Sequence, residues 1–165
     1  MAMKNGHNIR MIIYLILTLA VMAAIFFFSS QDGVISQRLS DSLLELLEAI
    51  IALLPEITGE GAALDIRKYA HIFMFFALGV CSWLFFHEVF ISHNRRLVRA
   101  ALASWPFCFI YACSDEAHQY FVPGRAGLMS DVIIDSVGFT AGIAALMIIF
   151  YIRAAVRRKR GASNE

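Results

Sequence analysis

Apolar residues are arranged along this chain in four long runs separated by polar segments. The runs cover residues 11–28, 69–91, 97–113 and 131–152. About 20 apolar residues are enough to cross the hydrocarbon core of a bilayer as an α-helix. The pattern therefore predicts an all-α fold, an integral membrane four-helix bundle in which each run is one span.

The segment between the first two spans carries a shorter apolar pattern. Leucines and isoleucines recur over residues 41–54, with Glu45 and Glu48 among them, and Pro55 follows. This stretch is too short to cross a bilayer, so we predict a short interfacial or re-entrant helix.

A signal peptide is the alternative interpretation of the first run, because Lys4 and Arg10 precede it. The run is longer than the apolar region of a usual signal peptide, and no clear cleavage motif follows it. A retained span is therefore favoured.

Composition agrees with membrane embedding, since 59% of the residues are hydrophobic and only 16% are charged. Soluble domains carry about 25% charged residues. Four spans in 165 residues leave no room for a soluble domain, so we expect a single membrane domain over residues 1–165.

The three cysteines lie inside apolar runs without metal-ligand spacing, and we predict that they pack as small hydrophobic residues.

Basic residues predict the orientation. If the N-terminus is cytoplasmic, ten of the 14 lysines and arginines lie at cytoplasmic span ends. Five of these ten are in the tail 153–165. The positive-inside rule then predicts a multi-pass protein of the cell membrane with both termini cytoplasmic. The basic tail is interpreted as a topology signal and a contact for anionic lipids, so no nucleic acid partner is expected.

Ionisable and amide side chains collect at the opposite, extracytoplasmic span ends. Charged groups at the edge of hydrocarbon are costly, so their convergence on one membrane face predicts a polar pocket there. The set comprises Arg67, Lys68, His71, Asp115, Glu116, His118, Gln119, Arg125, Asp131 and Asp135.

Spacing assigns some of these residues to shared helix faces. Arg67 and His71 are one turn apart, as are Asp115 and Gln119, whereas Glu116 points about 100° away from Asp115. The alternatives are that Arg67 and its neighbour Lys68 reach lipid headgroups and that the acidic segment is a solvated helix end.

Arg125 follows a Pro-Gly turn and is expected above the same face. It either binds an anionic group or forms an internal ion pair, the commoner outcome for a single arginine. The internal partners considered are Asp115, Glu116 and Asp131.

The fourth span places Asp131, Asp135, Gly138 and Gly142 on one face. The small residues predict close approach of another helix. Asp135 lies one turn deeper than Asp131, so it should be either paired or protonated. The partners considered are Arg67, Lys68, His71 and Arg125.

Asp115, Glu116, His118, Asp131 and Asp135 are candidate metal ligands by residue type. No spacing matches a recognised metal signature, and nearby cations would repel a metal ion. The sequence therefore predicts no metal and no cofactor.

Taken together, these motifs resemble the VanZ-like family over roughly residues 10–150. The resemblance rests on Arg67-Lys-x-x-His71, Asp115-Glu-x-x-Gln119, Pro123-Gly-Arg125-x-Gly127 and an aspartate at 131 followed by glycines at 138 and 142. The chain departs from the family pattern at Phe75, where a tyrosine is usual, and at Asp135, where an asparagine is common.

The resemblance implies a bacterial cell-envelope protein, linked by analogy to teicoplanin-type glycopeptide resistance. Two hypotheses follow: an enzyme acting on an anionic amphiphilic envelope substrate, or a non-catalytic protein that binds such a lipid or the antibiotic. A proton-coupled transporter is less favoured, because the inner span halves are almost devoid of polar groups.

The enzyme hypothesis assigns His71 or Glu116 as general base and Asp131 as the residue that orients it. The expected partners are membrane lipids and an anionic lipid-linked or glycolipid-like ligand, while the oligomeric state is left open. The residues assigned to binding are Arg67, Lys68, Asp115, Gln119, Arg125 and Asp135.

Overall fold

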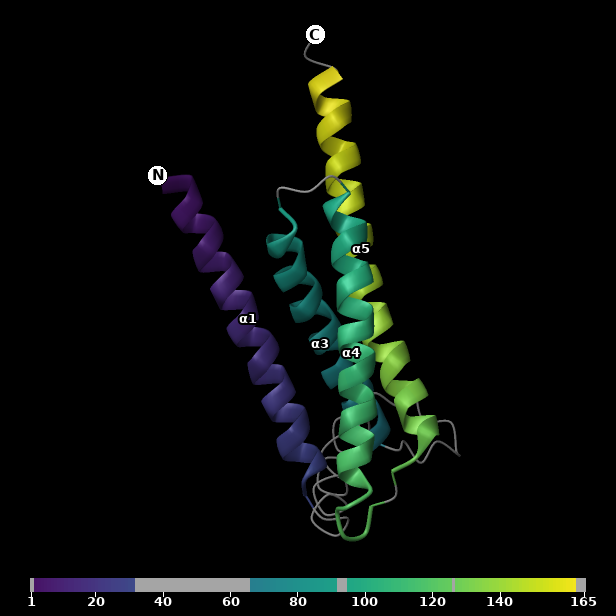
Figure 1. The fold of residues 1–165 in the computed structure, drawn as a ribbon. Coiled ribbons are helices and arrows are strands. Elements are labelled where there is room, and N and C mark those ends of the chain that lie inside the picture. Colours follow the sequence, from purple (N-terminus) through teal and green to yellow (C-terminus); the bar gives the residue numbers. More distant parts are fainter. Residues whose placement is uncertain (1, 32–65, 92–94, 126, 163–165) are drawn as a thin grey trace, which may run out of the picture.

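The computed structural model describes residues 2–31, 66–91, 95–125 and 127–162. Within these ranges the chain forms four α-helices and no strand, which confirms the predicted all-α fold (Figure 1). All four helices are long and apolar enough to cross a membrane. Their bounds are α1 Ala2–Ser29, α3 Ile66–Val89, α4 Arg96–Gln119 and α5 Met129–Ala162.

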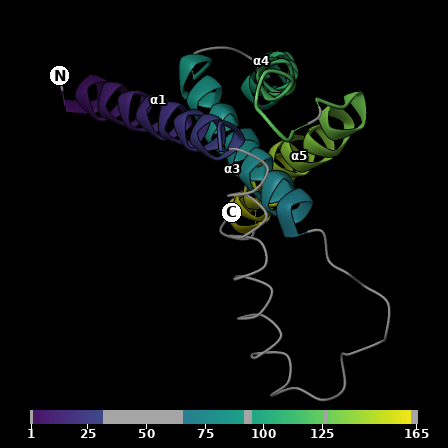
Figure 2. The same ribbon diagram turned by 90° about the horizontal axis from the view of Figure 1, so that it is seen from below.

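Neighbouring helices along the chain run in opposite directions, so α1 begins and α5 ends at the same end of the bundle (Figure 1). Helix α3 lies at the centre and packs against each of the other three, as the view along the bundle shows (Figure 2). The α4–α5 connection lies at the end where α1 stops and α3 starts.

Close approach between α3 and α5 depends on glycine, as the small-residue pattern predicted. A Cβ atom at Gly138 would lie 2.5 Å from the carbonyl oxygen of Ile72, and one at Gly142 would overlap the carbonyl oxygen of Phe76. The contact is reciprocal, because a Cβ at Gly79 would overlap the backbone of Phe139. The two backbones are therefore in direct van der Waals contact.

Large side chains fill the interior of the bundle, among them Phe75, Leu78, Trp83 and Phe139. Many other large apolar side chains are exposed, such as Leu102 at 70%. Exposure on this scale is what a surface in contact with lipid tails requires, because acyl chains solvate apolar groups as well as a protein interior does.

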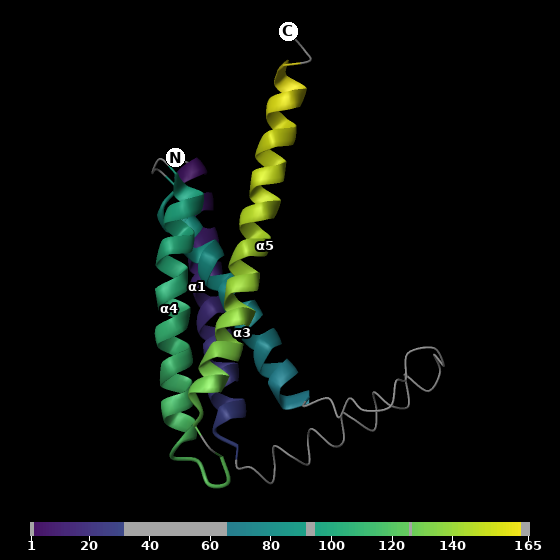
Figure 3. The same ribbon diagram turned by 90° about the vertical axis from the view of Figure 1, so that its right-hand side faces the viewer.

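Helix α5 is longer than its apolar run, and it projects beyond the other helices at its C-terminal end (Figure 3). The helix continues through the basic segment 153–160 because Ala, Arg and Lys are good helix formers. The predicted short helix at 41–54 lies outside the described residues, as do the side chains of Arg67 and Lys68.

Candidate functional site

Polar side chains from the ends of α1, α4 and α5 are buried together at the end of the bundle that holds the α4–α5 connection. None of them is more than 6% exposed. Helix α3 adds His71, whose side chain is 18% exposed. We call these six residues the polar cluster: Ser29, His71, Asp115, Glu116, Gln119 and Asp135.

Asp115 is held by two donors. Its Oδ2 atom accepts a hydrogen bond of 2.9 Å from the hydroxyl of Ser29 and another of 2.9 Å from the side-chain amide of Gln119. The second bond is the predicted one-turn contact on α4. The first joins α1 to α4 through residues 86 positions apart in the sequence.

Glu116 is bound differently from its neighbour. Its Oε2 accepts a 3.0 Å hydrogen bond from the backbone N–H of Leu128, and its Oε1 accepts one of 3.3 Å from Gln119. The two adjacent carboxylates thus point in different directions, as the helical spacing indicates, but both use the amide of Gln119. The Leu128 contact fixes the end of the connection against α4.

Arg125 ties the α4–α5 connection to the end of α1. Its guanidinium donates to the carbonyl oxygens of Phe28 at 2.7 Å and Gln31 at 2.9 Å, and to the Oε1 atom of Gln119 at 3.2 Å. The preceding Pro-Gly turn is present, with Gly124 at φ 73° in the left-handed region that suits glycine. These contacts join the α4–α5 connection to the end of α1 and hold Arg125 beside the polar cluster.

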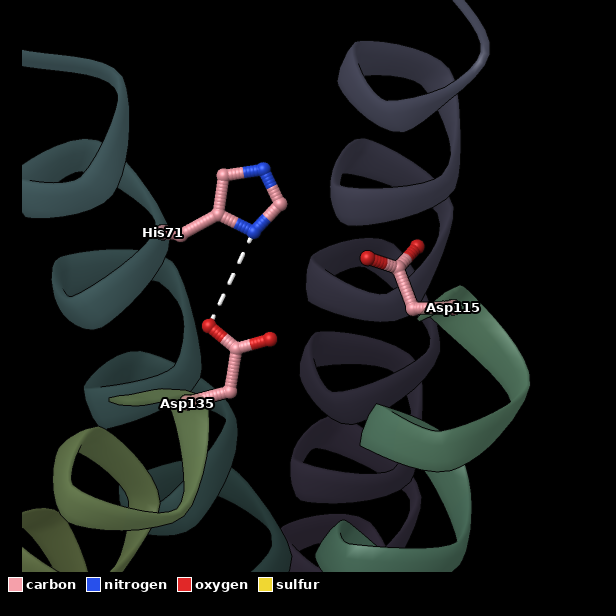
Figure 4. Close-up of side chains that lie close together, drawn as sticks. All are labelled: His71, Asp115 and Asp135. Carbon is pink, nitrogen blue, oxygen red and sulfur yellow. Dashed lines mark ion pairs between the residues drawn. The ribbon is translucent and has the colours of Figure 1, made fainter. Parts of the chain in front are cut away.

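His71 and Asp135 form a pair across the α3–α5 contact. The His71 Nδ1 and Asp135 Oδ1 atoms are 3.7 Å apart, so His71, one of the partners predicted from the sequence, lies beside Asp135. Asp115 faces this pair from α4 (Figure 4). One ligand-type atom from each of the three residues lies within 4.8 Å of the others.

Two buried carboxylate oxygens in this group have no hydrogen-bond partner among the described residues. They are Oδ1 of Asp115 and Oδ2 of Asp135. A buried acceptor without a partner is costly, because it has lost its water and gained no donor. The described residues therefore leave the hydrogen-bonding capacity of the cluster incompletely satisfied.

Two further predicted residues, Asp131 and His118, lie at the edge of the cluster. Asp131 is half-buried in the first turn of α5, and its Oδ1 accepts a 3.3 Å hydrogen bond from Ser130. The carboxylate beside His71 thus belongs to Asp135. It lies one turn deeper than Asp131, the residue predicted to orient the base. His118 stacks on Phe26 with ring centroids 4.5 Å apart.

Ser29 was not among the predicted site residues, although it is fully buried and bonded to Asp115. Its position gives a signal in retrospect, since it is the last residue of α1 and closes an apolar run. A hydroxyl at such a boundary is equally suited to water, so only the packing of α1 against α4 shows its partner.

A second polar contact lies at the other end of the bundle. Glu88 of α3 is 2.9 Å from His7 and 3.4 Å from Arg10, both on α1. His87 is buried and packs against the rings of Trp83 and Phe150, which also contact each other. These groups are separate from the polar cluster. The Glu88 contacts join α1 to α3, and the His87 contact with Phe150 joins α3 to α5.

The fold and the cluster define a multi-pass membrane protein with four spans and buried polar groups gathered at one bundle end. A family model described as VanZ/LLP1 matches residues 12–151, and the chain belongs to this family. Comparisons with curated proteins and with solved structures give no match.

Proposed function

We propose that this protein binds or transforms an anionic amphiphilic molecule of the bacterial cell envelope at the extracytoplasmic face of the membrane. The observation that carries the proposal is the gathering of hydroxyl, imidazole, carboxylate and amide groups from four helices at one end of the bundle, all of them buried except the partly exposed His71. A bundle held by apolar packing alone has no need of such groups, which cost free energy near hydrocarbon.

The orientation in this proposal follows from charge. Basic residues gather at the bundle end where α1 begins and α5 ends, and the positive-inside rule places that end in the cytoplasm. The polar cluster is at the opposite end and would face outward. An amphiphile could then present its headgroup there while its tail stays in lipid.

The enzyme version of the proposal assigns roles to three residues. His71 would act as general base and Asp135 would orient its ring, replacing Asp131 in that role because Asp135 is the carboxylate 3.7 Å away. Glu116 is the second candidate base, held in place by the Leu128 N–H. The alternative is a non-catalytic protein that binds the lipid or a glycopeptide antibiotic and changes its access to the surface.

Bound lipid identified by mass spectrometry tests the proposal. The full chain is purified in mild detergent from bacterial membranes, and the extracted lipids are compared with those of Arg125→Ala and of Arg99→Ala, an exposed arginine near the other bundle end. We expect one anionic lipid class enriched in the wild type and in Arg99→Ala and depleted in Arg125→Ala. Equal lipid profiles in all three would refute binding at this end.

Catalysis is separated from binding by incubating the reconstituted protein with the enriched lipid. An enzyme yields a new lipid species that Glu116→Gln or His71→Ala abolishes while both variants keep the lipid bound. A binding protein yields no new species, and Glu116→Gln then retains its lipid. A link to teicoplanin-type resistance is tested by the antibiotic's inhibitory concentration with and without expression of the chain.

A further inference from the structure

We infer that His71, Asp115 and Asp135 form a binding site for a divalent transition-metal ion. Their ligand-type atoms lie within 4.8 Å of one another although they come from three different helices (Figure 4). The His71 Nδ1 to Asp135 Oδ1 distance of 3.7 Å is already close to the separation of about 3.3 Å between two ligands of a tetrahedral ion with bonds of about 2.0 Å.

Unsatisfied atoms supply the second, independent argument. Asp115 and Asp135 are 3% and 1% exposed, and among the described residues each has one carboxylate oxygen without a hydrogen-bond partner. Buried charges are normally paired or coordinate metals. An ion between the two carboxylates would engage these oxygens, and two carboxylates with a neutral imidazole balance its double positive charge.

The surroundings of Asp115 resemble the outer shell that orients a metal ligand. Ser29 and Gln119 both donate to Oδ2, which fixes the carboxylate and leaves Oδ1 for an ion. Ligating carboxylates are commonly held in this way. Sequence spacing gave no metal signature because the three ligands come from separate helices.

The ligand set favours zinc. One imidazole with two carboxylates suits Zn²⁺ and, less strongly, Mn²⁺, whereas Mg²⁺ prefers oxygen ligands and several waters. Three protein ligands leave a coordination position open for water or for an oxygen of a bound molecule.

An ion would also resolve a charge conflict in the proposed function. The polar cluster contains three carboxylates, which repel an anionic headgroup, whereas a cation between two of them attracts it. This inference deepens the proposed function, because it supplies a cation for the same cluster. With His71 and Asp135 as ligands, the general base of the enzyme version is the second candidate, Glu116. Its experiment adds no lipid and measures bound metal, so it fails or succeeds separately from the lipid analysis.

Zinc binding to the purified full chain tests the inference. The protein is isolated through a tag without histidine, stripped with EDTA, dialysed and titrated with ZnCl₂, MnCl₂ or MgCl₂ in a calorimeter, with bound metal counted by mass spectrometry. We expect one zinc ion per chain, weaker binding of Mn²⁺ and the weakest of Mg²⁺.

Variants locate the ion. Asp135→Asn and His71→Ala should each weaken zinc binding by at least about 100-fold, since loss of an outer-shell partner alone costs 10–100-fold. Ser29→Ala keeps all three ligands and should weaken zinc binding about 10-fold. It tests the inference even if the variants of the ligands themselves do not fold. Glu88→Gln removes a buried carboxylate at the other bundle end and should bind zinc as the wild type does. A wild type that binds no zinc, or ligand variants that bind it equally well, would overturn the inference.

Discussion

At the residue scale, the polar cluster depends on a single amide. Gln119 is 1% exposed, and it donates to both adjacent carboxylates while its oxygen accepts a hydrogen bond from Arg125. An amide is the side chain suited to this position, because it carries donors and an acceptor on one planar group. A carboxylate of the same shape would turn two attractive contacts into repulsive ones.

Replacement of Gln119 by glutamate should therefore destabilise the protein. We expect Gln119→Glu to lower the free energy of unfolding by about 1–3 kcal/mol, the range for leaving a buried polar group unsatisfied. Thermal unfolding in detergent, followed by circular dichroism, measures the change. Ser114→Ala, at an exposed position on the same helix, is the control and should unfold near the wild-type temperature. A Gln119→Glu variant as stable as this control would contradict the role given to the amide.

At the element scale, the α3–α5 contact determines where the His71–Asp135 pair lies. Gly138 is three residues after Asp135 and rests on the backbone of Ile72, the residue after His71. The close packing of the two helices and the proximity of the two side chains are therefore one structural feature. Any substitution that pushes the helices apart should also separate the pair.

A methyl group at Gly138 tests this coupling. Gly138→Ala should cost about 1–3 kcal/mol, as overpacking does, and should reduce zinc or lipid binding as well. Gly6→Ala is the matched control, because nothing lies within 4 Å of the added Cβ and the substitution gains about 1 kcal/mol of helix propensity. Thermal unfolding of both variants gives the comparison. Equal stability of the two would show that α3 and α5 can separate at little cost.

At the scale of the whole molecule, the two bundle ends differ in chemistry. One end buries the polar cluster beneath the α4–α5 connection, and the other carries the basic end of α5 and the contact between Glu88 and α1. This asymmetry is what a protein with a fixed orientation in the membrane requires. The polar cluster has a function at the surface only if its end faces outside.

Cysteine labelling in intact cells checks the orientation. In a background with Cys81, Cys108 and Cys113 replaced by alanine, Pro123→Cys should react with a membrane-impermeant maleimide. Val156→Cys should react only after the cells are permeabilised, because the positive-inside rule keeps the basic end of α5 inside. Both positions are exposed in the structure. The reverse labelling pattern would place the polar cluster in the cytoplasm and refute an envelope-facing site.

The sequence alone determined the four spans, because run length and apolarity are properties of consecutive residues. It also identified residues whose spacing places them on one helix face, such as Asp115 with Gln119 and Gly138 with Gly142. Those one-turn relations hold in any α-helix, so no tertiary contact was needed to predict them.

Only the tertiary structure decided which helix faces which. It brought Ser29 to Asp115 and His71 to Asp135, and it directed the hydrogen bonds of Arg125 to carbonyl oxygens at the end of α1. Contacts between separate spans depend on how the helices rotate and tilt as they pack, and that follows from many weak contacts distributed along the whole bundle. Hydrophobic periodicity does not specify how the helices rotate and tilt against one another. For this reason, three potential metal ligands on three separate helices gave no recognisable spacing in the sequence.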